Sequence, residues 1–249
     1  MYHLKKSLGQ HFLKDEGVVN QIIEALRKCR FTNLLEVGPG GGALTKKLIQ
    51  IPEINLKAVE LDEEKVGFLQ KKFPELNGKI IHESILTMKL PFNEPFTIIG
   101  NFPYNISTQI LFKIIEWKDH VPNAIGMFQK EVAERVASKE GNKVYGVISL
   151  LVQYYYDVEY LFSVNNKSFA PPPKVQSAVI KLTAKKDLFP VKSEKAFWLL
   201  VKTAFNQRRK TLRNALKSIM PKEVLEDKLF DRRAETLSLE EFANLTFKM

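Results

Sequence analysis

The chain of 249 residues is long enough to bury a sizeable core in one large domain, or in one domain with a small appendage. Its 45% of hydrophobic residues and its scattered charges exclude a disordered chain, and the sequence contains no run of roughly 20 apolar residues that would span a membrane. Lys and Arg total 38 against 28 acidic residues, and this net charge of +10 favours a polyanionic partner, nucleic acid before an anionic membrane surface.

The N-terminal sequence MYHLKKSLGQHFLKDEG lacks the apolar core of a signal peptide, so we expect a cytoplasmic protein. The single cysteine, Cys29, cannot form an internal disulfide, which agrees with a reducing compartment. We expect no metal site.

Apolar runs rich in branched residues alternate with amphipathic stretches from about residue 17 to about residue 183. The runs that read as strands are residues 33–38, 55–61, 78–84, 96–101 and 123–129. The stretches with a helical pattern between them are residues 42–50, 63–73 and 107–117. This alternation predicts an α/β domain built on a doubly wound parallel sheet with helices on both faces.

The later part of the chain reads differently. Two further strands fit residues 145–164 less cleanly, and this stretch is ambiguous because its first half could equally be a helix. After the segment PPPKVQSAVIKLTA (171–184), we expect helical segments only from about residue 192 onward. A connector near 184–192 therefore predicts two domains, residues 1–187 and residues 188–249.

A glycine cluster follows the first predicted strand, in LLEVGPGGGALTKKL. Glycine adopts backbone angles closed to other residues and lets a ligand approach the backbone closely. Gly38, Gly40 and Ala43 satisfy the dinucleotide pattern G-x-G-x-x-G/A. Glu60, about 20 residues later at the end of the second strand, can accept hydrogen bonds from both hydroxyls of a ribose. These residues alone allow either a nicotinamide dinucleotide or S-adenosylmethionine.

Glu36 favours the second ligand. Its carboxylate stands two residues before the first glycine, where it would repel a pyrophosphate but suits the cationic amine and sulfonium of S-adenosylmethionine. The arrangement E-x-G-x-G resembles the first motif of S-adenosylmethionine-dependent methyltransferases. We therefore expect S-adenosylmethionine as cofactor, a Rossmann-like methyltransferase domain, and a small all-helical C-terminal domain.

The segment GNFPYNIST (100–108) brings polar and aromatic residues to the end of the fourth predicted strand, where open α/β sheets bind ligands. The Asn101 side-chain oxygen and the Phe102 carbonyl would accept the two N–H groups of an adenine amine, so that its nitrogen lone pair points at a methyl donor. Pro103 fixes φ and would hold that carbonyl, while Tyr104 offers a face for stacking. No strong base is needed, because the sulfonium departs as a neutral thioether and positioning supplies most of the catalysis.

NFPYNIST also resembles the N-L/I-P-Y motif of the rRNA adenine N6,N6-dimethyltransferases, the KsgA/Dim family. Other segments carry the resemblance in the same order over nearly the whole chain: KKSLGQHFL, LLEVGPGGGALT, AVELD, MFQKEVAERV, YGVISLLVQYY, FAPPPKVQSAVIKL and AFNQRRKTLRN. The resemblance implies a bacterial enzyme that dimethylates the N6 atoms of two adjacent adenosines in the 3′-terminal hairpin of 16S rRNA, with a role in small-subunit biogenesis.

Two alternatives stay open. One is the related class that methylates large-subunit rRNA and confers macrolide resistance, which shares the first six motifs; the FNQRRKTLRN segment, expected to be helical, and PPPKVQSAV favour the small-subunit enzyme. The other is a non-catalytic assembly or transcription factor that binds RNA with the same fold. Intact Asn101, Pro103 and Tyr104 argue against lost catalysis.

The resemblance also implies roles for single residues. His11 and Leu13 would close over the cofactor, and Phe169 of FAPPP would stack on the adenine face opposite Tyr104. Ser84 stands where the family usually has an aspartate that accepts a hydrogen bond from the cofactor's adenine amine, and Phe102 replaces the usual Leu or Ile. The expected cofactor-binding residues are His11, Leu13, Glu36, Gly38, Gly40, Glu60, Leu61, Ser84, Ile85 and Asn101. The expected catalytic residues are Asn101, Phe102, Pro103, Tyr104 and Phe169.

Residues 195–217 hold seven basic side chains and no acidic one. A charge run is usually a solvated helix face, but the complete lack of acids favours phosphate contacts. The expected RNA-binding residues are Lys5, Lys6, Lys174, Arg208, Arg209, Lys210, Arg213 and Lys217. We expect a monomer that binds small-subunit rRNA, in a partly assembled small subunit, and no membrane.

Overall fold

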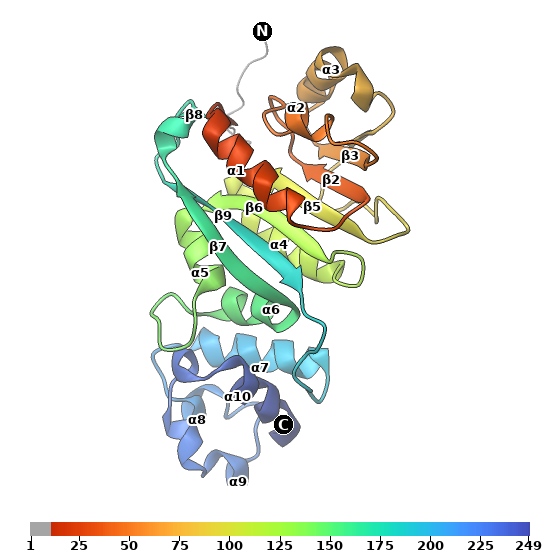
Figure 1. Cartoon of the computed structure of the whole chain (residues 1–249). Helices are drawn as coiled ribbons and strands as arrows, with labels where there is room; N and C mark the ends of the chain where they lie inside the picture. The colour runs from red at the N-terminus through yellow and green to blue at the C-terminus, as the bar shows by residue number, and fades with distance from the viewer. Residues whose placement is uncertain (1–10) are drawn as a thin grey trace. The chain divides into compact units, whose positions relative to one another are not determined.

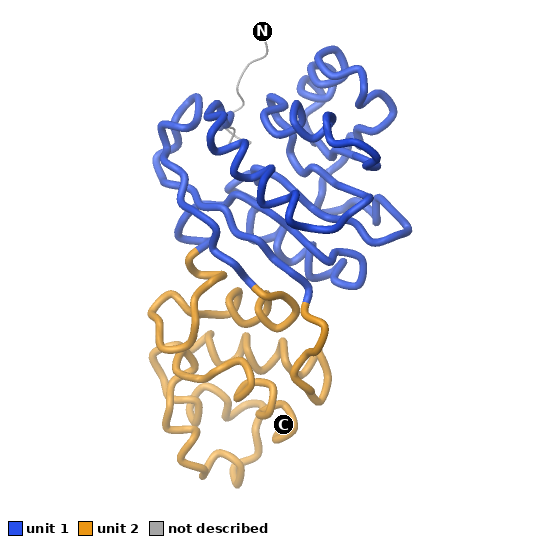
Figure 2. The backbone as a smooth tube through the Cα atoms, viewed as in Figure 1, with its two compact units in different colours: residues 1–133, 158–184 blue, residues 134–157, 185–249 orange. Residues whose placement is uncertain are grey.

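The computed structural model describes residues 11–249, which divide into two compact units (Figure 2). Unit 1 contains the described residues up to 133 together with residues 158–184, and unit 2 contains residues 134–157 and 185–249. Unit 2 therefore takes in a segment from the middle of the chain as well as the C-terminal residues. The division into a methyltransferase domain, residues 1–187, and an RNA-binding domain, residues 188–249, stays a prediction.

A seven-stranded sheet in the order β4-β3-β2-β5-β6-β9-β7 lies at the centre of unit 1 (Figure 1). Its strands are β2 (Asn33–Val37), β3 (Asn55–Glu60), β4 (Ile80–His82), β5 (Phe96–Asn101), β6 (Asn123–Gln129), β7 (Tyr156–Val164) and β9 (Ser177–Ala184). Strands β2 to β6 pair in parallel, and β9 pairs antiparallel with β6. The sheet confirms the predicted α/β fold, and each of the five predicted ranges contains one of the five parallel strands. The sheet is not wholly parallel as predicted, because the unpredicted strand β9 pairs antiparallel with β6.

Helices cover both faces of this sheet, with α1 on the near face and α4 on the far face in Figure 1. The helices that begin in unit 1 are α1 (Glu16–Arg27), α2 (Thr45–Leu48), α3 (Glu63–Lys72), α4 (Ser107–Glu116) and α5 (Lys130–Ala137). The Asp15 side chain caps α1 by accepting from the N–H groups of Gly17 and Val18. Covered on both sides, the central strand β2 is buried at all five positions.

The ambiguous residues 145–164 form a helix and then a strand. Helix α6 (Val147–Tyr155) passes directly into β7 at Tyr156. Most of its apolar side chains are buried, so packing rather than local pattern decides between helix and strand.

The C-terminal part of unit 2 is helical. Its helices are α7 (Glu194–Asn206), α8 (Leu212–Ala215), α9 (Lys222–Leu225) and α10 (Leu239–Leu245), and its 3-10 turns are Lys228–Asp231, Ala234–Thr236 and Thr246–Lys248. In residues 11–249, no helix combines the length and the hydropathy needed to cross a membrane.

The expectation that FNQRRKTLRN is helical throughout is wrong. Helix α7 ends at Asn206, and a turn follows in which the Lys210 N–H donates to the Gln207 carbonyl over 2.8 Å. The chain re-enters a helix at Leu212, whose N–H donates to the Arg232 carbonyl over 2.8 Å and whose side chain is fully buried. The turn thus accompanies a backbone hydrogen bond between Leu212 and a distant segment, and sequence periodicity does not report such a contact.

Candidate active site

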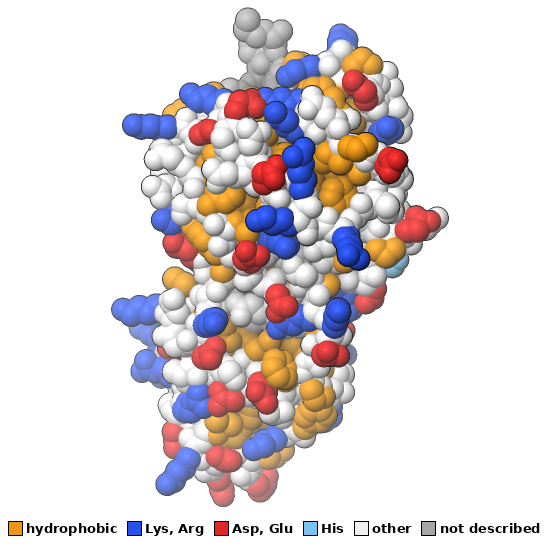
Figure 3. Space-filling view, in the orientation of Figure 1, with side chains coloured by type: hydrophobic (Ala, Val, Ile, Leu, Met, Phe, Trp, Pro, Cys, Tyr) orange, Lys and Arg blue, Asp and Glu red, His pale blue; other side chains and the backbone are white. Residues whose placement is uncertain are grey.

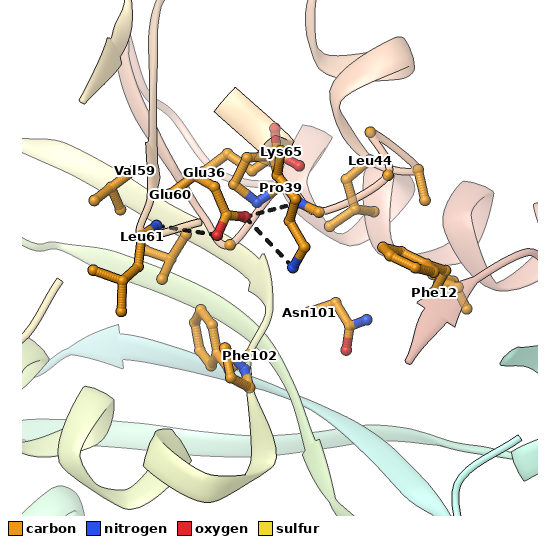
Figure 4. Close-up of a pocket in the computed structure, with 18 of the residues that line it drawn as sticks. Phe12, Glu36, Pro39, Leu44, Val59, Glu60, Leu61, Lys65, Asn101 and Phe102 are labelled. Carbon is orange, nitrogen blue, oxygen red and sulfur yellow. Dashed lines mark hydrogen bonds and ion pairs between the residues drawn. The ribbon is translucent and has the colours of Figure 1, made fainter. Parts of the chain in front are cut away.

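A cavity of about 460 Å³ opens at the carboxyl ends of β2, β3 and β5 in unit 1 (Figure 4). Ligands bind at this edge of open α/β sheets, because the loops that follow parallel strands meet there. The cavity is lined by the predicted residues His11, Leu13, Glu36, Gly38, Gly40, Glu60, Leu61, Ser84, Ile85, Asn101, Phe102, Pro103 and Tyr104. The tertiary structure thus brings together segments that lie up to 93 positions apart in the chain.

The glycine cluster forms a tight loop between β2 and α2. Gly38 and Gly40 have φ values of 67° and 56°, in the left-handed region that favours glycine. A Cβ atom on Gly38 would lie 3.6 Å from Pro103 Cδ, and one on Gly40 would lie 3.5 Å from Phe12 Cε1. The loop therefore presents bare backbone to the cavity and packs close to two other lining segments.

Glu60, at the end of β3, is tied to the backbone around it and is 7% exposed. Its Oε1 accepts from the N–H groups of Leu61 and Asp62, at 3.0 and 3.1 Å. Its Oε2 accepts from the Gly40 N–H at 3.3 Å, and Lys65 Nζ lies 4.0 Å from the same oxygen (Figure 4). The predicted ribose carboxylate is thus oriented before any ligand arrives.

Sequence reasoning missed Lys65, which also lines the cavity. It stands in the first turn of α3, and side chains of a first turn lean back toward the helix start. The sequence did hold a signal for it: Lys65 follows Glu60 by five residues, at the start of the helix predicted after the second strand.

Glu36 is buried, with 1% of its surface exposed. The Thr45 hydroxyl donates to its Oε2 at 2.7 Å. Burial nevertheless raises the pKa of the Glu36 carboxyl from 4.5 to about 7. The predicted negative charge is therefore incomplete at neutral pH, and a cation bound nearby would favour its ionised form.

The NFPY segment holds its polar groups in place through backbone contacts. Asn101 Nδ2 donates to the His11 carbonyl at 3.3 Å, so Oδ1 is the acceptor that this amide can offer to a ligand. The Phe102 N–H donates to the Met127 carbonyl at 3.2 Å, and its buried ring packs edge-on against Phe128 at 5.1 Å. Pro103, with φ of −57°, follows directly. The side chain of residue 102 thus serves packing, and the role predicted for its carbonyl stays a prediction.

Tyr104 begins a short 3-10 turn (Tyr104–Ile106). Its hydroxyl is hydrogen-bonded to Ser177 Oγ of β9, and burial raises the pKa of the phenol, which therefore stays neutral near pH 7. Its ring stacks beside the His11 ring with centroids 5.9 Å apart. Sequence reasoning missed Ser177, although the residue lies within the PPPKVQSAV segment that it singled out.

A small two-stranded sheet joins the start of the described chain to the FAPPP segment. Strand β1 (Phe12–Leu13) pairs antiparallel with β8 (Phe169–Ala170). His11 Nδ1 lies 2.9 Å from the Pro171 carbonyl oxygen, which makes it the donor. Phe169 differs from the expectation: its ring is 1% exposed, belongs to the hydrophobic core of unit 1, and is not among the residues that line the cavity. Stacking on a base would require the ring to leave this core position.

Ser84 lies at the cavity as expected. Its Oγ accepts from the Leu86 N–H at 3.3 Å, which caps the turn after β4. Ile85 beside it is buried, and Leu61 is 55% exposed at the rim. Contact between Ser84 and an adenine amine stays a prediction.

The predicted RNA-binding residues fall into different surroundings. Lys5 and Lys6 lie outside the described residues, and Lys174 is exposed in unit 1. In unit 2, Arg209, Lys210 and Lys217 are exposed, and Arg208 donates to the Lys143 carbonyl. On the face drawn in Figure 3, basic side chains are scattered among acidic ones.

Arg213 is engaged within unit 2. Its Nη2 lies 2.7 Å from Asp231 Oδ1, its Nε donates to the same oxygen at 3.1 Å, and its Nη1 donates to the Leu225 carbonyl. These contacts tie α8 to two later segments. A structural role for Arg213 therefore competes with its predicted contact to RNA.

Comparison with known proteins agrees with this geometry. Residues 1–246 match the family Ribosomal RNA adenine dimethylase. A Flavobacterium johnsoniae protein named Ribosomal RNA small subunit methyltransferase A is 50% identical over 98% of this chain and 95% of the relative. A Cytophaga hutchinsonii protein of the same name is 48% identical over 97% of this chain and 95% of the relative.

Solved structures show the same fold. A dimethyladenosine transferase from Plasmodium falciparum is 26% identical, with a TM-score of 0.81, over 94% of this chain and 96% of the other. The 23S rRNA methyltransferase ErmE is 22% identical, with a TM-score of 0.74, over 95% of this chain and 98% of the other. The second likeness concerns the fold alone.

Proposed function

Because the chain belongs to the ribosomal RNA adenine dimethylase family, we propose that it dimethylates the N6 atoms of two adjacent adenosines in the 3′-terminal hairpin of small-subunit rRNA. The chain is an S-adenosylmethionine-dependent methyltransferase of rRNA. The observation that carries the proposal is that the glycine loop, Glu60 and the complete NFPY segment line one cavity. The names of the relatives favour the small subunit over the large one.

The cavity fits the cofactor on its own chemistry. Its volume of about 460 Å³ lies in the range of small-molecule sites, which is roughly 300–1,000 Å³. Two carboxyl groups that line the cavity, Glu36 and Glu60, suit a ligand that brings hydroxyl groups and positive charge, because carboxylate oxygens accept from hydroxyls and attract cations. Glu60 would hold the ribose, and Gly38 and Gly40 would lie against the methionine part. S-adenosylmethionine supplies a methyl group bonded to a sulfonium sulfur, and the sulfur is the leaving group, which becomes a neutral thioether.

Asn101 and Phe102 would orient the adenine amine. With Nδ2 committed to the His11 carbonyl, Asn101 Oδ1 accepts one N–H of the amine, and the Phe102 carbonyl accepts the other. Held in this way, the nitrogen lone pair would point at the methyl carbon of the bound cofactor, and methyl transfer would leave the electron pair of the S–C bond on sulfur. The alkylated amine releases a proton to water, so the site needs no strong base.

Tyr104 would hold the base in place. Its neutral phenol is fixed by Ser177, so the ring is held where its face can stack on the base. Positioning of this kind supplies the main catalytic effect, because it turns a bimolecular reaction into one between prealigned groups.

We further propose that the substrate is rRNA in a partly assembled small subunit, methylated by a monomeric cytoplasmic enzyme. The net charge of +10 supports an RNA-rich partner.

Asn101→Ala tests the assignment. We expect at least about a hundredfold loss of single-turnover methyl transfer, since the lost acceptor acts on the amine in the transition state. RNA affinity by filter binding stays near the wild-type value. The matched control is Asn20→Ala, on the exposed side of α1.

The substrates are small subunits and naked small-subunit rRNA from cells that lack the enzyme, and mass spectrometry maps the dimethyladenosine. An Asn101→Ala rate within about twofold of wild type would remove Asn101 from the mechanism. Methylation of large-subunit rRNA alone would overturn the substrate assignment.

A further inference from the structure

Lys65 places a buried positive charge in the cofactor cavity. The residue is 7% exposed, and its Nζ lies 4.0 Å from Glu60 Oε2 and 5.7 Å from the centre of the Phe12 ring. Figure 4 shows the side chain extending from α3 toward Glu60. Lys65, Glu60 and Phe12 all line the cavity.

The burial of Lys65 distinguishes it from the other cavity lysines. Among residues 11–249, those lining the cavity are Lys14, Lys46, Lys65 and Lys72. The side chains of Lys65 and Glu60 are 9% and 8% exposed, whereas those of Lys46 and its partner Glu16 are 37% and 55% exposed. Water and salt screen the exposed pair strongly and the buried pair little, so the charge of Lys65 acts on a ligand in the cavity.

The ligands of this cavity differ in charge at one atom. S-adenosylmethionine carries a positive charge on sulfur, and S-adenosylhomocysteine, which methyl transfer leaves behind, carries none. That sulfur is bonded to the C5′ carbon of the ribose. If Glu60 holds the 2′ and 3′ hydroxyls of the ribose, the ammonium beside Glu60 acts on the same nucleoside whose C5′ carbon carries the sulfonium, and like charges repel.

We propose that Lys65 is a specificity-determining residue, which lowers the affinity of the cavity for cationic S-adenosylmethionine relative to neutral S-adenosylhomocysteine. This inference rests on the proposed function, because it takes Glu60 as the ribose carboxylate. Methyl transfer removes the charge from sulfur, so the same repulsion is relieved as the methyl group leaves. By linkage, Lys65 shifts the equilibrium of methyl transfer within the bound complex toward the products. The size of this shift equals the factor by which Lys65 raises the ratio of the Kd for S-adenosylmethionine to the Kd for S-adenosylhomocysteine.

Calorimetric titration of both ligands into wild-type protein and variants tests the proposal. Lys65→Met removes the charge and keeps an unbranched side chain, and Glu60 keeps its three backbone donors. We expect the ratio of the Kd for S-adenosylmethionine to the Kd for S-adenosylhomocysteine to fall by at least about threefold, the effect of one weakly screened charge. Lys65→Arg keeps the charge and should leave the ratio within about twofold of wild type.

Lys46→Met is the matched control, because it removes an exposed lysine from the same cavity and should leave the ratio unchanged. An unchanged ratio in Lys65→Met, an equal fall in Lys46→Met, or an equal fall in Lys65→Arg would each overturn the proposal. Equal weakening of both ligands in Lys65→Met would overturn it too, since Lys65 would then contact a group common to both. Lys65→Gln replaces Lys65→Met if thermal unfolding shows that the methionine variant does not fold.

The titrations separate this inference from the proposed function. If wild-type protein binds neither ligand, the cofactor assignment itself fails. If wild-type protein binds both ligands and substitution of residue 65 leaves the ratio of the two Kd values unchanged, only the role of Lys65 fails.

Discussion

Glu36 and Glu60 line the same cavity, but their surroundings differ. Glu60 accepts three backbone N–H groups and lies beside Lys65, whereas the side-chain donor to Glu36 is the Thr45 hydroxyl. Burial dominates at Glu36 and raises its pKa to about 7. The two glutamates that the sequence assigns to cofactor binding, Glu60 to the ribose and Glu36 to the cationic part, therefore have different electrostatic properties.

The raised pKa of Glu36 predicts a pH-dependent stability. Between the unfolded value of 4.5 and the folded value of about 7, the folded protein binds more protons than the unfolded chain. The free energy of unfolding therefore falls as pH rises through this window, by up to about 3 kcal/mol from this group. In Glu36→Gln the contribution is lost, because the amide does not titrate.

Urea unfolding of both proteins between pH 5 and pH 8 measures the difference. The wild-type protein should lose stability relative to Glu36→Gln as the pH rises. Parallel pH profiles for the two proteins would show that Glu36 keeps its ordinary pKa in the folded state.

At the scale of elements, the ring of Phe102, which directly follows β5, packs against β6. A Cβ atom on Gly126 would overlap Phe102 Cε2 and lie 2.7 Å from Phe128 Cε2. Both rings are buried, so they have little room to give way. The absence of a side chain at Gly126 thus sets the place of the Phe102 ring, and with it the backbone of the NFPY segment.

Gly126→Ala should destabilise the protein by about 1–3 kcal/mol, as overpacking of a buried site does. It should also slow methyl transfer, because displacing the Phe102 ring moves the carbonyl expected to accept from the adenine amine. Urea unfolding and single-turnover rates measure the two effects.

Gly67→Ala is the matched control. Gly67 lies inside α3, and a Cβ there would meet nothing within 4 Å. Alanine should stabilise the helix by roughly 0.5–1 kcal/mol. Equal effects of the two substitutions would contradict a packing role for Gly126.

At the scale of the whole molecule, the net charge of +10 predicts salt-dependent binding to RNA. Exposed Arg209 and Lys210 stand in the turn between α7 and α8, and neither substitution should disturb a helix. Replacing both with Gln should flatten the slope of log affinity against log salt by about one to two units, with cofactor affinity unchanged. Filter binding of rRNA at several salt concentrations measures the slope.

Arg213→Gln is the comparison for this pair. It should lower the stability of the protein, because it removes the contacts to Asp231 and to the Leu225 carbonyl. An unchanged slope in the double variant would mean that Arg209 and Lys210 are only solvated. A large change in the salt slope of Arg213→Gln at unchanged stability would instead show that Arg213 contacts RNA.

The sequence by itself determined the five parallel strands of the sheet and most of the cavity. Strands β2 to β6 follow from apolar runs, and the glycine loop, Glu60 and the NFPY segment follow from motifs at strand ends. These features are local: side-chain pattern along a few residues decides them, and the edge where parallel strands end is the same for all of them. The family resemblance added the function.

Only the tertiary structure decided the remaining features, because each depends on which distant segments meet. Lys65 beside Glu60, Ser177 on the Tyr104 hydroxyl and the buried ring of Phe169 all come from packing. The raised pKa of Glu36 comes from its burial, and the break in FNQRRKTLRN comes with a backbone hydrogen bond from Leu212 to the distant Arg232 carbonyl. Burial and partners across the chain are properties of the folded molecule, so a local sequence pattern does not contain them.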